Sequence, residues 1–365
     1  MKITETPRRH FASDNYAGIC PEAWEAMAQA NQGHAVSYGD DPWTARAADL
    51  IRETFEMACE VFFVFNCTAA NSLAVAALGQ SYHSVLCHET AHLETDECGA
   101  PEFFSNGMKV LLLPGNQGKI EPAGIERLVG RRSDIHYPKP WAVSVTQATE
   151  LGTVYTVEEL KAIWAKAKQL GLRLHMDGAR FANAVASLGI KPREITWEVG
   201  VDVLCLGGVK NGAAVGEAVV FFNRDLAGEF DYRCKQAGQL CSKMRFMAAP
   251  WVGMLQNGAW LRHAAHANAM ARCLHDELAR IPEARLLFPT QANAVFADLP
   301  PWLIVALREA GWQFYTFIGQ GGCRFMCAWD TTKEDVAAFV RDVKRLLIAA
   351  PRHIPPPPAN HRKLH

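Results

Sequence analysis

The sequence contains no pair of cysteines with two residues between them, and neither sign of charge is in excess. Its 11 cysteines are odd in number and scattered along 365 residues, and the formal net charge is −1. Without a redox dithiol motif, we expect these thiols to be reduced and mostly buried, as in a cytoplasmic protein. The balanced charge gives no electrostatic reason to expect a nucleic-acid partner.

Long apolar runs are missing as well. The longest, such as residues 213–222, carry a charge or fall well short of the ~20 residues that a membrane-spanning helix needs. Residues 1–10 are polar and charged, with no apolar region behind them that could direct export. We therefore expect no membrane partner. Residues 351–365 include four consecutive prolines and several bases, which predicts an extended tail outside the fold.

Short apolar runs rich in Val, Leu and Phe recur through the first two thirds of the chain, and helical patterns separate several of them. This alternation predicts an α/β fold in which a mostly parallel, seven-stranded sheet is covered by helices. The seven predicted strands are Val61–Phe65, Ser84–Cys87, Met108–Leu113, Ala142–Gln147, Leu172–Asp177, Val203–Leu206 and Ala218–Phe222. The clearest helix begins at Thr156, where Glu159 completes a capping box, and is ended by Gly171.

The pattern changes after about residue 245. Helical segments at 259–281, 302–310 and 332–349 alternate with apparent strands at 286–299 and 323–328. This order predicts a smaller α+β domain. The expected division is therefore a large domain at 1–245, a small domain at 246–350 and the tail at 351–365.

An acid and an amine each follow a predicted strand. Asp177 ends one apolar strand, and Lys210 follows the next, after the pair Gly207–Gly208. A pyridoxal phosphate site requires this pair, because the amine forms a Schiff base with the cofactor aldehyde and the acid keeps the pyridine nitrogen protonated. Taken singly, Asp177 could cap a helix and Lys210 could be a mobile surface residue. Together they indicate a cofactor site.

Three further segments each allow more than one interpretation. The turn at 65–71 could bind a phosphate with its backbone N–H groups and the Thr68 hydroxyl, or Thr68 could be an ordinary helix cap.

Residues 88–92 have the sequence His-Glu-Thr-Ala-His, which is the zinc-protease motif, but they follow a strand, and Pro101 comes soon after them. A loop with incidental histidines, or a histidine lying over a flat cofactor ring, fits better. Arg324, in an apolar strand, is expected to meet either a substrate carboxylate or a protein acid.

Two motifs together resemble the low-specificity L-threonine aldolases, which are pyridoxal phosphate enzymes of the aspartate-aminotransferase-like fold. His175-Met-Asp-Gly-Ala-Arg180 is close to that family's most specific motif, and Gly208-Val-Lys-Asn-Gly212 looks like the lysine segment of one bacterial branch. The resemblance runs from Phe11 to about residue 350.

The resemblance implies cleavage of L-threonine or L-allo-threonine to glycine and acetaldehyde, or a related lyase reaction on phenylserine-type substrates. It also implies a homodimer or homotetramer with shared active sites, and no metal. The implied cofactor contacts are Lys210, Asp177, Cys67, Thr68 and His92, together with Lys235 and Arg245 reaching a neighbouring subunit's cofactor; the implied substrate contacts are Ser13, Arg180 and Arg324.

The sequence departs from the family pattern at two positions. Cys67 stands where relatives commonly have glycine, which predicts a tighter phosphate turn. Glu150 lies near where some relatives carry a second histidine, so the catalytic base is either His92 or a water that His92 positions.

Overall fold

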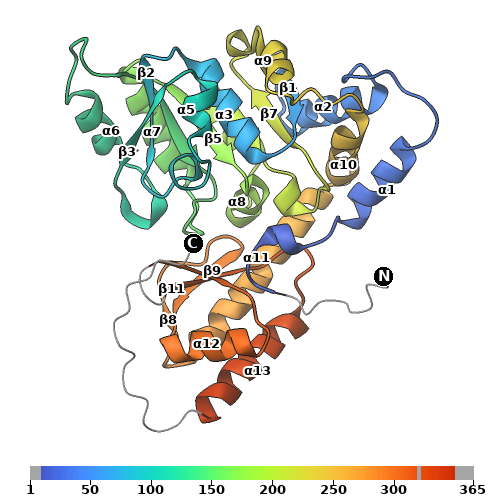
Figure 1. Cartoon of the computed structure of the whole chain (residues 1–365), viewed down its shortest axis with the longest axis vertical. Helices are drawn as coiled ribbons and strands as arrows, with labels where there is room; N and C mark the ends of the chain where they lie inside the picture. Colours follow the sequence, from blue (N-terminus) through green and yellow to red (C-terminus); the bar gives the residue numbers. More distant parts are fainter. Residues whose placement is uncertain (1–9, 319–321, 350–365) are drawn as a thin grey trace.

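The computed structural model describes residues 10–318 and 322–349 as two lobes (Figure 1). The larger lobe contains a seven-stranded sheet, and the smaller one contains a four-stranded sheet with α12 (Pro301–Glu309) and α13 (Lys333–Ala349). The long helix α11 (Ala259–Leu278) runs from one lobe into the other.

The large sheet has the strand order β1-β7-β6-β5-β4-β2-β3. Its strands are β1 (Glu60–Val64), β2 (His83–His88), β3 (Lys109–Leu113), β4 (Lys139–Thr146), β5 (Arg173–Gly178), β6 (Val203–Leu206) and β7 (Glu217–Phe221). The central strands β3, β2, β4, β5 and β6 pair in parallel, while β7 is antiparallel to both of its neighbours. The predicted α/β fold with a mostly parallel sheet is confirmed, and each predicted apolar run is a strand.

Helices cover both faces of this sheet. They are α1 (Pro21–Ala30), α2 (Pro42–Phe55), α3 (Cys67–Leu78), α4 (His92–Thr95), α5 (Ala100–Phe104), α6 (Pro122–Val129), α7 (Val157–Gln169), α8 (Phe181–Leu188), α9 (Phe230–Gln236) and α10 (Arg245–Gln256). The capping box that was predicted for α7 is present: Thr156 Oγ1 accepts from the backbone N–H of Glu159 at 3.2 Å, and Glu159 Oε2 accepts from that of Thr156 at 2.7 Å.

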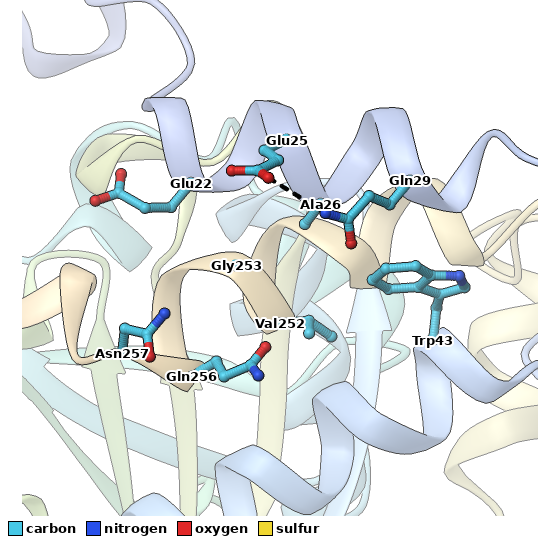
Figure 2. Close-up of a pocket in the computed structure, with 9 residues that line it drawn as sticks. All are labelled: Glu22, Glu25, Ala26, Gln29, Trp43, Val252, Gly253, Gln256 and Asn257. Carbon is cyan, nitrogen blue, oxygen red and sulfur yellow. Dashed lines mark hydrogen bonds between the residues drawn. The ribbon is translucent and has the colours of Figure 1, made fainter.

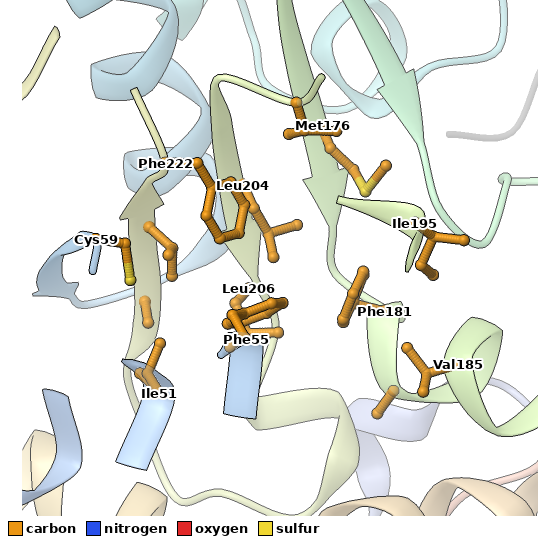
Figure 3. Packing of buried hydrophobic residues seen from close by; sticks show 14 of the residues in the cluster. Ile51, Phe55, Cys59, Met176, Phe181, Val185, Ile195, Leu204, Leu206 and Phe222 are labelled. Carbon is orange, nitrogen blue, oxygen red and sulfur yellow. The ribbon is translucent and has the colours of Figure 1, made fainter. Parts of the chain in front are cut away.

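The two faces of the sheet have separate cores. On one face, Phe55 of α2 and Phe181 of α8 pack with Leu204 and Leu206 of β6 (Figure 3). On the other face, the apolar side chains of α3 cover alternate positions of the strands, including Cys205. Since successive side chains of a strand point to opposite faces, β5 directs Met176 into the first core and Asp177 toward α3.

The small sheet is antiparallel throughout, in the order β10-β11-β9-β8. Its strands are β8 (Arg285–Leu286), β9 (Ala294–Asp298), β10 (Tyr315–Ile318) and β11 (Gly322–Met326). The single strand predicted at 286–299 is wrong: the structure has two short strands there, and Pro289 lies in the connection. Strand β10 was not predicted.

The boundary between the two lobes does not follow the chain order strictly. Phe11 lies in the core of the small lobe, where its backbone joins β11 through the N–H of Met326 at 2.8 Å. Helix α10, by contrast, places Met247 and Trp251 in the core of the large lobe. The division at residue 245 stays a prediction, and the predicted tail at 351–365 lies outside the described residues.

No helix of the described residues is long and apolar enough to span a membrane.

Candidate active site

The carboxyl ends of the parallel strands face the small sheet across a cavity of about 400 Å³. This is where open α/β sheets bind their ligands. The lining residues come from both lobes and from the amino-terminal segment: Ser13, Asn15, His92, Asp96, Glu150, Arg180, Lys210, Tyr315, Thr316, Phe317 and Arg324.

Asp177 lies at the end of β5 beneath α3 and is 1% exposed. Its Oδ1 accepts from the backbone N–H of Ala179 at 3.0 Å, and its Oδ2 accepts from Asn71 Nδ2 at 3.1 Å. The Cys67 thiol lies 3.8 Å from Oδ1. Burial and the nearby charge of Asp177 raise the pKa of Cys67 well above its usual value, so this thiol stays neutral.

Lys210 lies in a short 3-10 turn, η5 (Val209–Asn211), directly after β6. Two glycines let this turn approach its neighbours closely: a Cβ on Gly207 would lie 2.3 Å from the carbonyl oxygen of Ala179, and one on Gly208 would lie 2.6 Å from the Trp251 ring. The turn is thereby held against both β5 and α10, and it presents Lys210 to the cavity.

The predicted phosphate turn opens helix α3, in which Cys67 and Thr68 are the first two residues. The cap is Asn66, whose Oδ1 accepts from the N–H of Ala69 at 2.9 Å, so Thr68 is not the capping residue. The N–H groups of the first helical residues have no partner within the helix, and the helix dipole favours an anion there. Cys67 and Thr68 therefore remain candidates for holding a phosphate.

His92 begins the short helix α4, and its imidazole lines the cavity. Its Nδ1 lies 2.9 Å from Oε1 of the buried Glu97, and Asn71 Nδ2 donates to the same oxygen at 2.9 Å. Asn71 thus connects the carboxylates of Asp177 and Glu97. Burial works to lower the pKa of His92, but the hydrogen bond to Glu97, helped by the charges of Asp177 and Glu150, raises it overall.

The His-Glu-Thr-Ala-His segment does not form a metalloprotease helix. His88 ends strand β2, and its ring nitrogens contact Thr90 Oγ1 at 2.9 Å and the carbonyl of Gly115 at 3.1 Å. His92 belongs to a different element, so the two histidines do not share a helix face.

Arg180 and Arg324 line the same cavity but differ in their partners. Arg180 donates from Nε and Nη2 to the two carboxylate oxygens of buried Asp14, at 2.7 and 3.0 Å. In Arg324 the buried Nε has no hydrogen-bond partner among the described residues. The Arg324 guanidinium lies 5.4 and 5.0 Å from the ring centroids of Tyr315 and Phe317. Burial, followed by the charge of Arg180, lowers the pKa of Arg324.

Comparison with known proteins identifies the family. Residues 10–300 match the beta-eliminating lyase family. A low specificity L-threonine aldolase of Pseudomonas aeruginosa is 65% identical, with 93% of this chain and 98% of the relative aligned; one from a Pseudomonas sp. is 62% identical over 93% and 99%. The solved threonine aldolase of Leishmania major superposes with a TM-score of 0.87, at 30% identity, over 92% of this chain and 99% of that one.

This chain belongs to the low-specificity L-threonine aldolase family. The resemblance predicted from the sequence is therefore confirmed. Enzymes of this family depend on pyridoxal 5′-phosphate, which confirms the predicted cofactor.

The residues of this family member fit the cofactor. A pyridine nitrogen needs a buried acid, and Asp177 supplies one at the end of β5, beneath α3. The aldehyde needs an amine, and Lys210 follows the adjacent strand β6. The phosphate needs N–H donors, which the start of α3 offers at Cys67 and Thr68.

Lys235 and Arg245 do not line the cavity of their own chain. The Lys235 amine lies over the Tyr38 ring, 4.6 Å from its centroid, and Arg245 Nε donates to the carbonyl of Ala30 at 3.1 Å. Their implied contact with a neighbouring subunit's cofactor stays a prediction.

Sequence reasoning missed four buried polar residues around this aldolase-family site, namely Asp14, Asn71, Glu97 and Glu217. One signal was available: Asn71 lies four residues after Cys67, which places both on the same face of helix α3. The other three lie in segments that give no period or motif.

A second hollow lies on the surface between α1 and α10 (Figure 2). Its charged groups are Glu22 and Glu25, and Gln29 donates to Glu25 at 3.4 Å. The helices touch closely there, since a Cβ on Gly253 would lie 2.0 Å from the carbonyl oxygen of Glu22. Acids alone do not match an anionic cofactor, so this hollow is not the candidate site.

Proposed function

We propose that this chain is a pyridoxal phosphate-dependent aldehyde-lyase that cleaves L-threonine or L-allo-threonine to glycine and acetaldehyde. The observation that carries the proposal is that Lys210 and Arg324 line one cavity, while the buried Nε of Arg324 has no hydrogen-bond partner among the described residues. A buried guanidinium N–H without a hydrogen-bond partner favours an anion, and a substrate carboxylate supplies one. The relatives named above carry the same activity in their names.

The bound cofactor supplies an electron sink for the pair that the broken Cα–Cβ bond releases. Lys210 would hold the cofactor through its amine, and Asp177 would keep a proton on the ring nitrogen. Asn71 holds Asp177 in place through its 3.1 Å hydrogen bond. The buried carboxylate thereby favours the electron-accepting form of the ring.

Arg324 and Ser13, which line the cavity, bind the substrate carboxylate. Arg180 adds its positive charge, and its hydrogen bonds to Asp14 use Nε and Nη2 but not Nη1. Fixing the carboxylate orients the bond to be broken. His92, or a water that it positions, then removes the proton of the β-hydroxyl group, because His92 is the imidazole that faces the cavity.

A lyase for phenylserine-type substrates is the alternative within the family. The aromatic side chains of Tyr315 and Phe317 on the cavity wall favour it, since they offer an apolar surface to an aryl group. A zinc hydrolase is disfavoured because His88 and His92 lie on different elements.

We further propose a cytoplasmic homodimer or homotetramer with shared active sites. All 11 cysteines are free thiols, as is usual in a reducing compartment. Sharing is supported by Lys235 and Arg245, which are basic and lie away from the cavity of their own chain.

The test is an assay of the purified protein with L-threonine, L-allo-threonine and phenylserine, in which glycine and the aldehyde are both quantified. We expect cleavage to require pyridoxal phosphate and to survive prolonged treatment with a strong chelator. Loss of activity that stoichiometric zinc restores would contradict the proposal, whereas a kcat/KM that is much higher for phenylserine would select the alternative substrate.

A further inference from the structure

The start of strand β7 contacts both halves of the cofactor site. The Glu217 Oε2 accepts from the backbone N–H of Gly208 at 2.5 Å and from that of Val209 at 3.4 Å. One residue earlier, the N–H of Gly216 donates to the carbonyl of Phe65 at 3.2 Å. Gly208 and Val209 lead into Lys210, and Phe65 leads into the turn that opens α3.

This position follows from the sheet register. Glu217 pairs with Val64 at the end of β1, and Ala218 pairs with Leu206 at the end of β6. Because β7 runs antiparallel to both strands, its first residue lies where its two neighbours end. The side chain of Glu217 is 5% exposed, so its carboxylate can bind the Lys210 turn but contacts little water.

A buried carboxylate in an apolar sheet is costly unless something compensates its charge. Burial raises the pKa of Glu217 to about 7, while the Gly208 N–H and the charge of Lys210 act in the opposite direction. The other titratable groups that interact with Glu217 are Asp177 of β5, Cys205 of β6 and Cys67 of α3. Among the groups named in this paragraph, Lys210 is the one that carries a positive charge.

We propose that Glu217 is a positioning residue of the cofactor site. Its carboxylate fastens the turn that carries Lys210 to the strand beside the phosphate turn. In the holoenzyme its negative charge is expected to favour a proton on the nitrogen that joins Lys210 to the cofactor. This inference rests on the proposed role of Lys210. It adds to the site an acid distinct from Asp177, whose proposed partner is the ring nitrogen of the cofactor.

The test is a pH titration of the visible absorbance band of the holoenzyme, which reports the proton on the nitrogen that joins Lys210 to the cofactor. In Glu217→Gln the midpoint should move to lower pH by about one unit, because a negative charge near the protonated nitrogen is lost. Glu60→Gln is the matched control, since Glu60 lies at the far end of β1 in a surface pair with Arg224. Its midpoint should equal that of the wild type.

A folded Glu217→Gln protein with an unmoved midpoint would overturn the proposal. If that variant does not fold, Glu217→Asp decides: its shorter side chain keeps the charge but loses the contact, so the midpoint should hold while the cofactor dissociates at least threefold faster. Unchanged dissociation would overturn the proposal. Lys210→Ala separates the two claims, because a pH-dependent band that persists in this variant contradicts the role of Lys210 itself.

Discussion

The buried Nε of Arg324 has no hydrogen-bond partner among the described residues, and its guanidinium lies over the rings of Tyr315 and Phe317. We predict that Arg324→Ala raises the KM for L-threonine roughly ten- to a hundredfold, as expected for loss of a ~1.5–3 kcal/mol charge-assisted hydrogen bond, with little change in cofactor affinity. Arg308→Ala is a matched control because Arg308 also lies over a ring, that of Phe314, but does not line the cavity. Steady-state kinetics of both variants provide the measurement, and an unchanged KM in Arg324→Ala would make this arginine structural.

The pair of His92 and Glu97 determines the pH at which the imidazole can accept a proton. A base acts in its neutral form, so activity should rise as pH passes above the pKa of His92. Glu97 raises that pKa, and Glu97→Gln should therefore move the acid limb of the kcat/KM profile to lower pH, by about one unit. Glu94 is an exposed acid on α4, the helix that begins at His92. Glu94→Gln should therefore leave the acid limb in place. A limb that does not move in Glu97→Gln would exclude His92 as the titrating base.

Among the elements that carry site residues, the turn between β6 and η5 leaves no room for a side chain at Gly207. A Cβ on Gly207 would lie 2.3 Å from the Ala179 carbonyl oxygen, so Gly207→Ala must displace the Lys210 turn. We expect a loss of about 1–3 kcal/mol in the free energy of unfolding, together with weaker cofactor binding. Denaturant titration against Gly228→Ala, whose added methyl group meets nothing within 4 Å, measures the effect. Equal stability of the two variants would contradict the close packing described here.

The large sheet could be predicted from the sequence because its strands are buried on both faces and therefore form continuous apolar runs. Strand β10 could not, because Tyr315 and Phe317 are 44% and 37% exposed and line the cavity instead of a core. The prediction of one strand at 286–299 was wrong because it joined the apolar residues on both sides of Pro289 into a single run. Hydrophobic periodicity indicates which residues are buried in a core. It does not predict a strand whose apolar side chains line a cavity.

The candidate site was predictable where one residue type at a strand end has a specific chemistry, as for Asp177 and Lys210. Most of the buried polar residues around the site were not predictable, because their partners are distant in the chain. Asn71 and Asp177 are 106 positions apart, and Arg180 and Asp14 are 166 apart. Only the folded sheet brings such pairs together.

At the scale of the whole molecule, we predict an oligomer whose active sites need two subunits, since Lys235 and Arg245 lie outside the cavity of their own chain. Sedimentation velocity should show a dimer or tetramer at assay concentration. Mixing subunits of Lys210→Ala with subunits of Lys235→Ala, each inactive alone, should restore activity through hybrid sites. A fully active monomer would contradict shared sites.

The most direct test of the whole account locates the lysine that binds the cofactor. The purified protein is incubated with pyridoxal 5′-phosphate, reduced with borohydride and digested, and the modified peptide is identified by mass spectrometry. We expect a reduced cofactor group on Lys210, and we expect Lys210→Ala to lose both this group and the visible absorbance band. A group attached to a different lysine, or a protein that remains unmodified, would contradict it.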